Sequence, residues 1–135
     1  MTVTLTITNA IPEITGLQEK VAGLGKEHNL SEEIISDIKL VMEEAVSNII
    51  FYGFDDDGVH EIIITLEFSD RLITIGIEDQ GKPFNPLDNN GKAAGAPLED
   101  YDQGGMGLII IKELMDEIKY EYRKGINTLL MIKRL

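Results

Sequence analysis

The residues best suited to chemistry lie at 79–86 (Asp-Gln-Gly-Lys-Pro-Phe-Asn-Pro), directly after a strongly apolar segment. The carboxylate of Asp79 can accept a hydrogen bond from the exocyclic amine of adenine, and it disfavours a carbonyl in the same place. Because an unpaired buried acceptor costs about 1–3 kcal/mol, this contact would select adenine over guanine. Gly81 would supply a tight turn or a close approach to the base.

A second run has three glycines in four positions where a helix is expected to begin: Gly104, Gly105 and Gly107. The first amides of a helix have no intrahelical partner and lie at the positive end of its dipole, so they can bind phosphate. The run is not a P-loop, since it lacks the GKS or GKT ending, and no strand leads directly into it as in a dinucleotide fingerprint. Together the two runs predict a site for a purine nucleoside triphosphate.

Glu44 and Asn48 are four residues apart on an expected helix, which places their side chains about 40° apart on one face. A carboxylate beside an amide oxygen can orient water and bind Mg²⁺, which takes few protein oxygens in nucleotide sites. The simpler interpretation is that the pair belongs to the solvent-exposed face of the helix.

Composition limits the classes of protein that fit. The 135 residues are 43% hydrophobic, which suits one globular domain, and no apolar run approaches the ~20 residues that span a bilayer. The net charge of −12 disfavours direct binding of nucleic acid or of an anionic membrane surface. It suits a basic protein partner or Mg²⁺ accompanying a nucleotide. The absence of cysteine excludes disulfides and thiolate metal sites and fits a cytoplasmic protein.

Hydrophobic periodicity predicts five strands and three helices. The strands are expected at 2–8, 61–68, 71–79, 118–123 and 127–134, and the helices after Pro12, from Ser31 to about Tyr52, and at 106–117. Residues 81–107 hold three of the four prolines and six of the thirteen glycines, and are expected to be irregular. The order β-α-α-β-β-loop-α-β-β predicts an α+β two-layer sandwich, with a mixed, mostly antiparallel sheet and helices on one face.

In this order the motifs resemble those of a known superfamily. Residues 44–48 (Glu-Ala-Val-Ser-Asn), 79–86 and 104–108 resemble the N, G1 and G2 boxes of the Bergerat-fold, or GHKL-type, ATPases. These include gyrase-type, chaperone, histidine-kinase and mismatch-repair ATP-binding domains. The resemblance covers nearly the whole chain, as a single domain over 1–135. The short lid and the tail at 114–121 (Leu-Met-Asp-Glu-Ile-Lys-Tyr-Glu) look like the stand-alone anti-sigma-factor serine kinases.

The resemblance implies a role for each candidate residue. Glu44 would be the general base that orients the attacking hydroxyl, and Asn48 would ligate Mg²⁺. Asp79 would hold the adenine amine of ATP, with Gly81 beneath the ring. The phosphates would be held by the second glycine run, Gly104, Gly105 and Gly107.

The resemblance also implies a lid and partners. The stretch from about Asn85 to Gln103 would form the ATP lid. The substrate would be a serine on a small anti-sigma-factor antagonist, a STAS-like domain. The second partner would be a sigma factor or another regulator, which the kinase holds once the antagonist is phosphorylated. A homodimer is also expected from the resemblance.

Two positions differ from some kinase members. Tyr52 stands where some carry a histidine, and Gln103 stands where some carry an arginine. Since phosphoryl transfer relies on positive charge near the γ-phosphate, a second hypothesis is an ATP-binding regulatory module that binds a partner without efficient kinase activity. A detached histidine-kinase ATP domain is disfavoured, because no dimerisation helix with a phosphoacceptor histidine is found.

Overall fold

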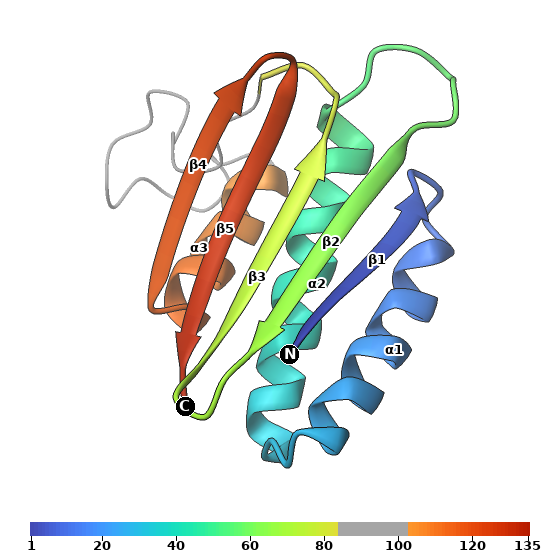
Figure 1. Ribbon diagram of the computed structural model, residues 1–135. Helices are drawn as coiled ribbons and strands as arrows, with labels where there is room; N and C mark the ends of the chain where they lie inside the picture. Colours follow the sequence, from blue (N-terminus) through green and yellow to red (C-terminus); the bar gives the residue numbers. More distant parts are fainter. Residues whose placement is uncertain (84–102) are drawn as a thin grey trace.

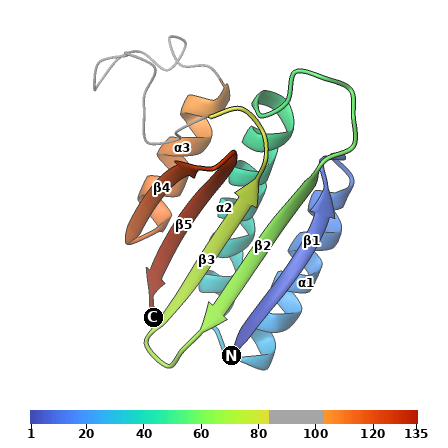
Figure 2. The same ribbon diagram turned by 45° about the horizontal axis from the view of Figure 1, so that its top comes forward.

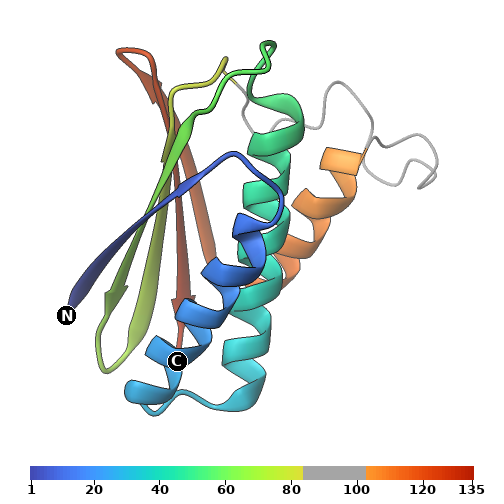
Figure 3. The ribbon, with the colours of Figure 1, turned by 90° about the vertical axis from the view of Figure 1, so that its right-hand side faces the viewer.

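In the computed structural model, which describes residues 1–83 and 103–135, three helices cover one face of a five-stranded sheet (Figure 1). The side chains of 103–106 lie outside this description. Seen edge-on, the sheet forms one layer and the helices the other (Figure 3). The predicted α+β two-layer sandwich is therefore confirmed.

The elements follow the predicted order. The strands are β1 (Thr2–Thr8), β2 (Glu61–Phe68), β3 (Leu72–Asp79), β4 (Glu117–Arg123) and β5 (Ile126–Arg134), and the helices are α1 (Glu13–Glu27), α2 (Glu32–Tyr52) and α3 (Gln103–Leu114). Across the sheet the strands are arranged β1-β2-β3-β5-β4 (Figure 2), and these four pairings are all antiparallel. None of the described helices is long and apolar enough to cross a membrane.

Helix α3 begins and ends earlier than the sequence predicted. It starts at Gln103 rather than Met106, so part of the glycine run lies in its first turn instead of in the preceding loop. Glycine has a low helix propensity, so the sequence carries no helical signal for this first turn. The helix ends at Leu114 because the chain turns into β4, where the amide of Asp116 donates to the carbonyl of Ile132 at 2.9 Å.

Helix α2 carries two of the predicted site residues, and both of its ends are defined by local contacts. Ser31 caps the N-terminus, with its hydroxyl accepting from the amide of Ile34 at 3.2 Å. At the other end the amide of Gly53 donates to the carbonyl of Ile49 at 2.8 Å. Helix α2 runs between α1 and α3 along the inner face of the sheet (Figure 1), and it ends beside the turn that follows β3, where the amide of Lys82 donates to the carbonyl of Gly53.

Rows of apolar side chains cross the inner face of the sheet. One row joins all five strands through aligned positions: Leu5, Ile64, Ile77, Leu129 and Tyr120. Helix α2 packs onto these rows with a buried stripe of Ile38, Val41, Met42, Ala45 and Val46.

Two residues beyond Ile77 along β3, the next row across the inner face is polar. Asp79 pairs with Asn127 of β5, and Asn127 pairs with Tyr122 of β4. Because side chains two apart share a face of a strand, Asp79 and Asn127 extend the same inner face as the apolar row. The hydrophobic core thus ends in a polar edge, and the candidate site lies there.

Candidate nucleotide-binding site

A small pocket of about 30 Å³ opens at this polar edge, between α2, α3 and the inner face of β3, β4 and β5. Its lining is mostly apolar and includes two of the predicted site residues, Asn48 and Asp79. The other lining residues are Ala45, Ile49, Ile77, Ile111, Tyr120, Asn127 and Leu129. An apolar pocket with a few convergent polar groups is typical of small-molecule sites.

Asp79 is the acidic residue of this pocket and is only 6% exposed. Its Oδ1 accepts from the amide of Gly81 at 2.8 Å and from Nδ2 of Asn127 at 3.1 Å. Burial raises the pKa of Asp79 above its ordinary value, and the two hydrogen bonds offset part of that rise. The carboxylate is thus held at the end of an apolar strand, as the sequence predicted, with its other oxygen unbonded by the described residues.

Sequence reasoning missed two residues beside Asp79. Asn127, 5% exposed, donates through Nδ2 to Asp79 and, at 3.1 Å each, to the carbonyls of Gly81 and Lys82. Its Oδ1 accepts a short hydrogen bond from the hydroxyl of Tyr120. The signal available in the sequence was an asparagine at an inward-facing position of an apolar strand, in step with Leu129.

Gly81 makes a close approach, but to the backbone of the protein. A Cβ on Gly81 would lie 2.4 Å from the carbonyl oxygen of Gly53 and 2.9 Å from Oδ1 of Asp79. The backbone amide of Lys82 donates to the same Gly53 carbonyl at 2.8 Å. The side-chain Nζ of Lys82 lies 2.9 Å from Oδ1 of Asp55. The turn after β3 is therefore packed against the end of α2.

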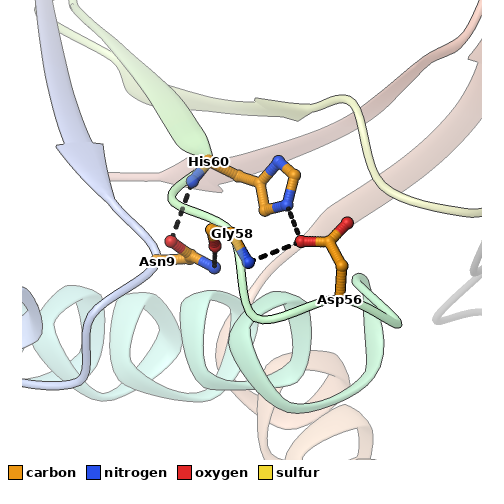
Figure 4. Close-up of polar contacts among 4 residues, drawn as sticks. All are labelled: Asn9, Asp56, Gly58 and His60. Atoms are coloured by element: carbon orange, nitrogen blue, oxygen red, sulfur yellow. Dashed lines mark hydrogen bonds and ion pairs between the residues drawn. The ribbon is translucent and has the colours of Figure 1, made fainter.

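The loop that joins α2 to β2 is held by further polar contacts (Figure 4). Oδ1 of Asp56 accepts from the amide of Gly58 and lies 2.7 Å from Nε2 of His60. The hydrogen bond to His60 is the main cause that lowers the pKa of Asp56, and the bond from Gly58 is the second. The side chain of Asn9 bonds the amide of His60 and the carbonyl of Gly58. His60 also stacks on Phe54, with ring centroids 4.0 Å apart. These contacts tie the loop to the end of β1.

On the helical side of the site, α2 and α3 meet at Gly107. A Cβ on Gly107 would lie 2.6 Å from Oε2 of Glu44 and 3.5 Å from Nδ2 of Asn48. The structure therefore brings Gly107 of the second glycine run against the pair of Glu44 and Asn48 on α2. Burial, and then the neighbouring Glu43, raises the pKa of Glu44.

The Asn48 side chain has unused bonding capacity. Its Nδ2 is buried and has no hydrogen-bond partner among the described residues. Such a group costs about 1–3 kcal/mol unless a ligand pairs with it. Because the oxygen and nitrogen of an amide are assigned from their contacts, the same side chain can present its oxygen instead.

These features fit an Asn48 side chain that supplies one oxygen ligand to Mg²⁺. Within 1–83 and 103–135, no group of three or more His, Cys, Asp or Glu side chains could hold a metal ion by itself. Mg²⁺ in nucleotide sites takes few protein oxygens and completes its coordination with phosphate and water.

The remaining predicted residues lie at the start of α3 and before it. Gly104 and Gly105 are in the first turn of α3. The predicted lid, from about Asn85 to Gln103, falls outside the described residues apart from Gln103, where α3 begins.

Comparisons with known proteins match nearly the whole chain. A sequence model of the family described as "Histidine kinase-like ATPase domain" matches residues 8–133. The anti-sigma F factor of Clostridium acetobutylicum is 30% identical over 114 residues, which are 84% of this chain and 79% of that protein. The serine-protein kinase RsbW of Bacillus velezensis is 31% identical over 133 residues, 93% of this chain and 81% of the relative.

Solved structures share the fold. A crystal structure of the RsbU and RsbW domains of a Mycobacterium tuberculosis protein superimposes with a TM-score of 0.72 at 17% identity. The superposition covers all of this chain and 32% of the longer chain in that crystal structure. The SiaB–SiaC complex of Pseudomonas aeruginosa gives a TM-score of 0.55 at 11% identity, over 97% of this chain and 89% of the other. The chain belongs to the histidine kinase-like ATPase family, and within it is related to the anti-sigma F factors and the RsbW serine-protein kinases.

Proposed function

We propose that the chain, as a single ATP-binding domain over residues 1–135, is an ATP-dependent serine/threonine protein kinase and anti-sigma regulatory factor. It phosphorylates an anti-sigma-factor antagonist and sequesters a sigma factor. Support comes from the family and from the names of its relatives. The observation that carries the proposal is the buried carboxylate of Asp79 at the polar end of an apolar pocket.

The chemistry of the pocket lining suits the adenine of ATP. Its apolar walls, among them Ile49 and Ile77, can pack on the faces of a flat ring, and Asp79 can accept the exocyclic amine. Guanine presents a carbonyl at that position, which would leave the carboxylate unpaired. Gly81 keeps the turn beside Asp79 close to α2.

The helical side of the site suits phosphoryl transfer. The first turns of α3, with Gly104, Gly105 and Gly107, would hold the phosphates at the positive end of the helix. Glu44 would orient the serine hydroxyl and accept its proton as the oxygen bonds to the γ-phosphorus and ADP leaves. A raised pKa makes Glu44 a better proton acceptor. Mg²⁺, when held through Asn48, would neutralise charge on the phosphates.

The protein partners follow from the relatives and from charge. The phosphorylated substrate would be a STAS-like antagonist, and the sequestered partner a sigma factor or another regulator. The net charge of −12 favours partners with basic surfaces and disfavours direct contact with nucleic acid or membrane. We further propose that the chain acts in the cytoplasm and can form a homodimer.

A second candidate function is an ATP-binding regulatory module that binds its partner without efficient transfer. The observation that favours it concerns charge: the causes that shift the pKa of Glu44 are burial and Glu43, and no cation of the described residues is among them. Tyr52 and Gln103 likewise supply no formal charge where some related kinases carry histidine or arginine.

Transfer to a candidate antagonist domain in the presence of Mg-ATP distinguishes the two. The proposal expects phosphoserine on the antagonist with wild-type protein, and its loss in Glu44→Gln with ATP binding retained. Glu43→Gln, one residue away on the exposed side of α2, is the matched control and should transfer phosphate. ATP and partner binding with no phosphoserine in the wild type would instead support the regulatory module. Absence of ATP binding would refute both.

A further inference from the structure

We propose that Asn127, with its amide held by Tyr120, is a positioning residue that aims the carboxylate of Asp79 at the base and thereby sets selectivity for adenine. The inference rests on the proposed binding of ATP and adds residues from β4 and β5 to it. The turn after β3, the base-reading carboxylate and the last hairpin then act as one unit.

The first step is the set of contacts made by Nδ2 of Asn127. It lies 3.1 Å from Oδ1 of Asp79, from the carbonyl of Gly81 and from the carbonyl of Lys82. An amide group has two hydrogens, so these acceptors share them. The side chain therefore links the carboxylate to the backbone of the turn.

The second step is that the orientation of this amide is determined by its surroundings. All three partners of Nδ2 are acceptors, whereas the partner of Oδ1 is the hydroxyl of Tyr120, which can donate. A flipped amide would place its oxygen against a carboxylate and two carbonyls. Tyr120 thus keeps the donor side of Asn127 facing Asp79.

The third step concerns the two oxygens of Asp79. Oδ1 already accepts from Gly81 and Asn127, which fixes the plane of the carboxylate. In the part of the chain that the structure describes, Oδ2 receives no hydrogen bond and remains available to a ligand. Without Asn127 the carboxylate would keep one anchor, at Gly81, and could rotate away from the base.

The test compares ATP with purine riboside triphosphate, which lacks the 6-amino group. The ratio of their dissociation constants measures the contact between Asp79 and the amine. A residue that only supports the fold would weaken both nucleotides equally and leave this ratio unchanged. A hydrogen bond to a charged group contributes about 1.5–3 kcal/mol, so we expect wild type to prefer ATP by about tenfold or more.

In Asn127→Ala this preference should fall to about threefold or less, which corresponds to the loss of roughly half of that hydrogen bond. Asn127→Thr retains a hydroxyl donor and should restore part of it. Tyr120→Phe keeps the ring in the pocket and removes only the hydroxyl, so it should lower the preference severalfold. Tyr122→Phe is the matched control: Tyr122 is aligned with Asn127 on β4 but is 45% exposed, and its variant should behave as wild type.

Each outcome is decisive. No binding of either nucleotide by wild type would refute the proposed function itself. Wild-type binding without preference for ATP would overturn the contact between Asp79 and the amine, and the inference with it, whereas a preference that survives in Asn127→Ala would overturn the role of Asn127 alone. If Asn127→Ala does not fold, the preference of Tyr120→Phe decides, and an unchanged value there overturns the inference.

Discussion

Glu44 of α2 and Gly107 of α3 approach so closely that no further side chain fits between them. A Cβ on Gly107 would lie 2.6 Å from Oε2 of Glu44 and 3.4 Å from its Cβ. Glycine at 107 therefore leaves the space that the Glu44 carboxylate occupies, in addition to exposing a backbone amide. The proposed general base therefore lies directly against the proposed phosphate-binding helix at Gly107.

Gly107→Ala should impair phosphate transfer without unfolding the protein. The added methyl displaces the end of the Glu44 side chain, which is flexible, while alanine favours the helix by about 0.5–1 kcal/mol. We expect a free energy of unfolding equal to or above that of wild type, together with a transfer rate at least tenfold lower, measured by denaturant titration and single-turnover assay.

The matched control for this variant is Gly23→Ala in α1, where an added Cβ has no neighbour within 4 Å. It should gain the same helical stabilisation and transfer phosphate at the wild-type rate. Full activity in Gly107→Ala would show that Glu44 does not need its present position.

Gly81→Ala should destabilise the protein itself. The methyl would lie 2.4 Å from the carbonyl oxygen of Gly53, and backbone cannot yield as a side chain can. Overpacking of this kind costs about 1–3 kcal/mol, visible as a lower midpoint of chemical unfolding. Gly76→Ala in the middle of β3, where the nearest atoms are 3.9 Å away, should keep or raise the wild-type midpoint. Equal midpoints for the two variants would contradict the packing of this turn on α2.

Asp79→Asn should separate folding from nucleotide binding. The folded-state pKa of Asp79 is raised by burial, so its contribution to stability is greatest at pH below the ordinary pKa of 3.8 and is lost as pH rises through the raised value. Asparagine removes the charge and keeps an acceptor for Gly81 and Asn127. At neutral pH the free variant should therefore be at least as stable as wild type.

The same variant should lose stabilisation by ATP. At a concentration ~100 times the dissociation constant, ATP adds ~2.7 kcal/mol to wild type, and thermal melts with and without Mg-ATP measure this gain. Glu78→Gln, an exposed neighbour on the opposite face of β3, should retain the gain. An undiminished ATP shift in Asp79→Asn would remove Asp79 from the site.

The pH dependence of transfer should reflect the raised pKa of Glu44. As general base it acts when ionised, so the rate should rise with pH through that value. Because Glu43 is the second cause of the rise, Glu43→Gln should move this limb to lower pH. Single-turnover rates across the acidic range test this, and an unmoved limb would assign it to another group.

The sequence determined the order of elements, the two-layer architecture and the inner faces of the strands, because these depend on local periodicity. Alternation in β2 and β3 and the cap at Ser31 are readable within one segment. The extent of α3 was misplaced, because the glycines of its first turn have low helix propensity and the termination at Leu114 depends on pairing between β4 and β5.

The composition of the site was only partly readable. Asp79 and Gly81 could be selected because a carboxylate that ends a strongly apolar strand, followed by a glycine, is a pattern contained within one short segment. Asn127 is 48 residues from Asp79, and only the antiparallel pairing of β3 with β5 places the two opposite each other. The contact of Gly107 with Glu44, and of Gly81 with Gly53, likewise arises from the packing of separate elements. Sequence by itself thus determined which residue types were available for chemistry, whereas the tertiary structure decided which of them touch, because distances between segments depend on sheet register and helix packing.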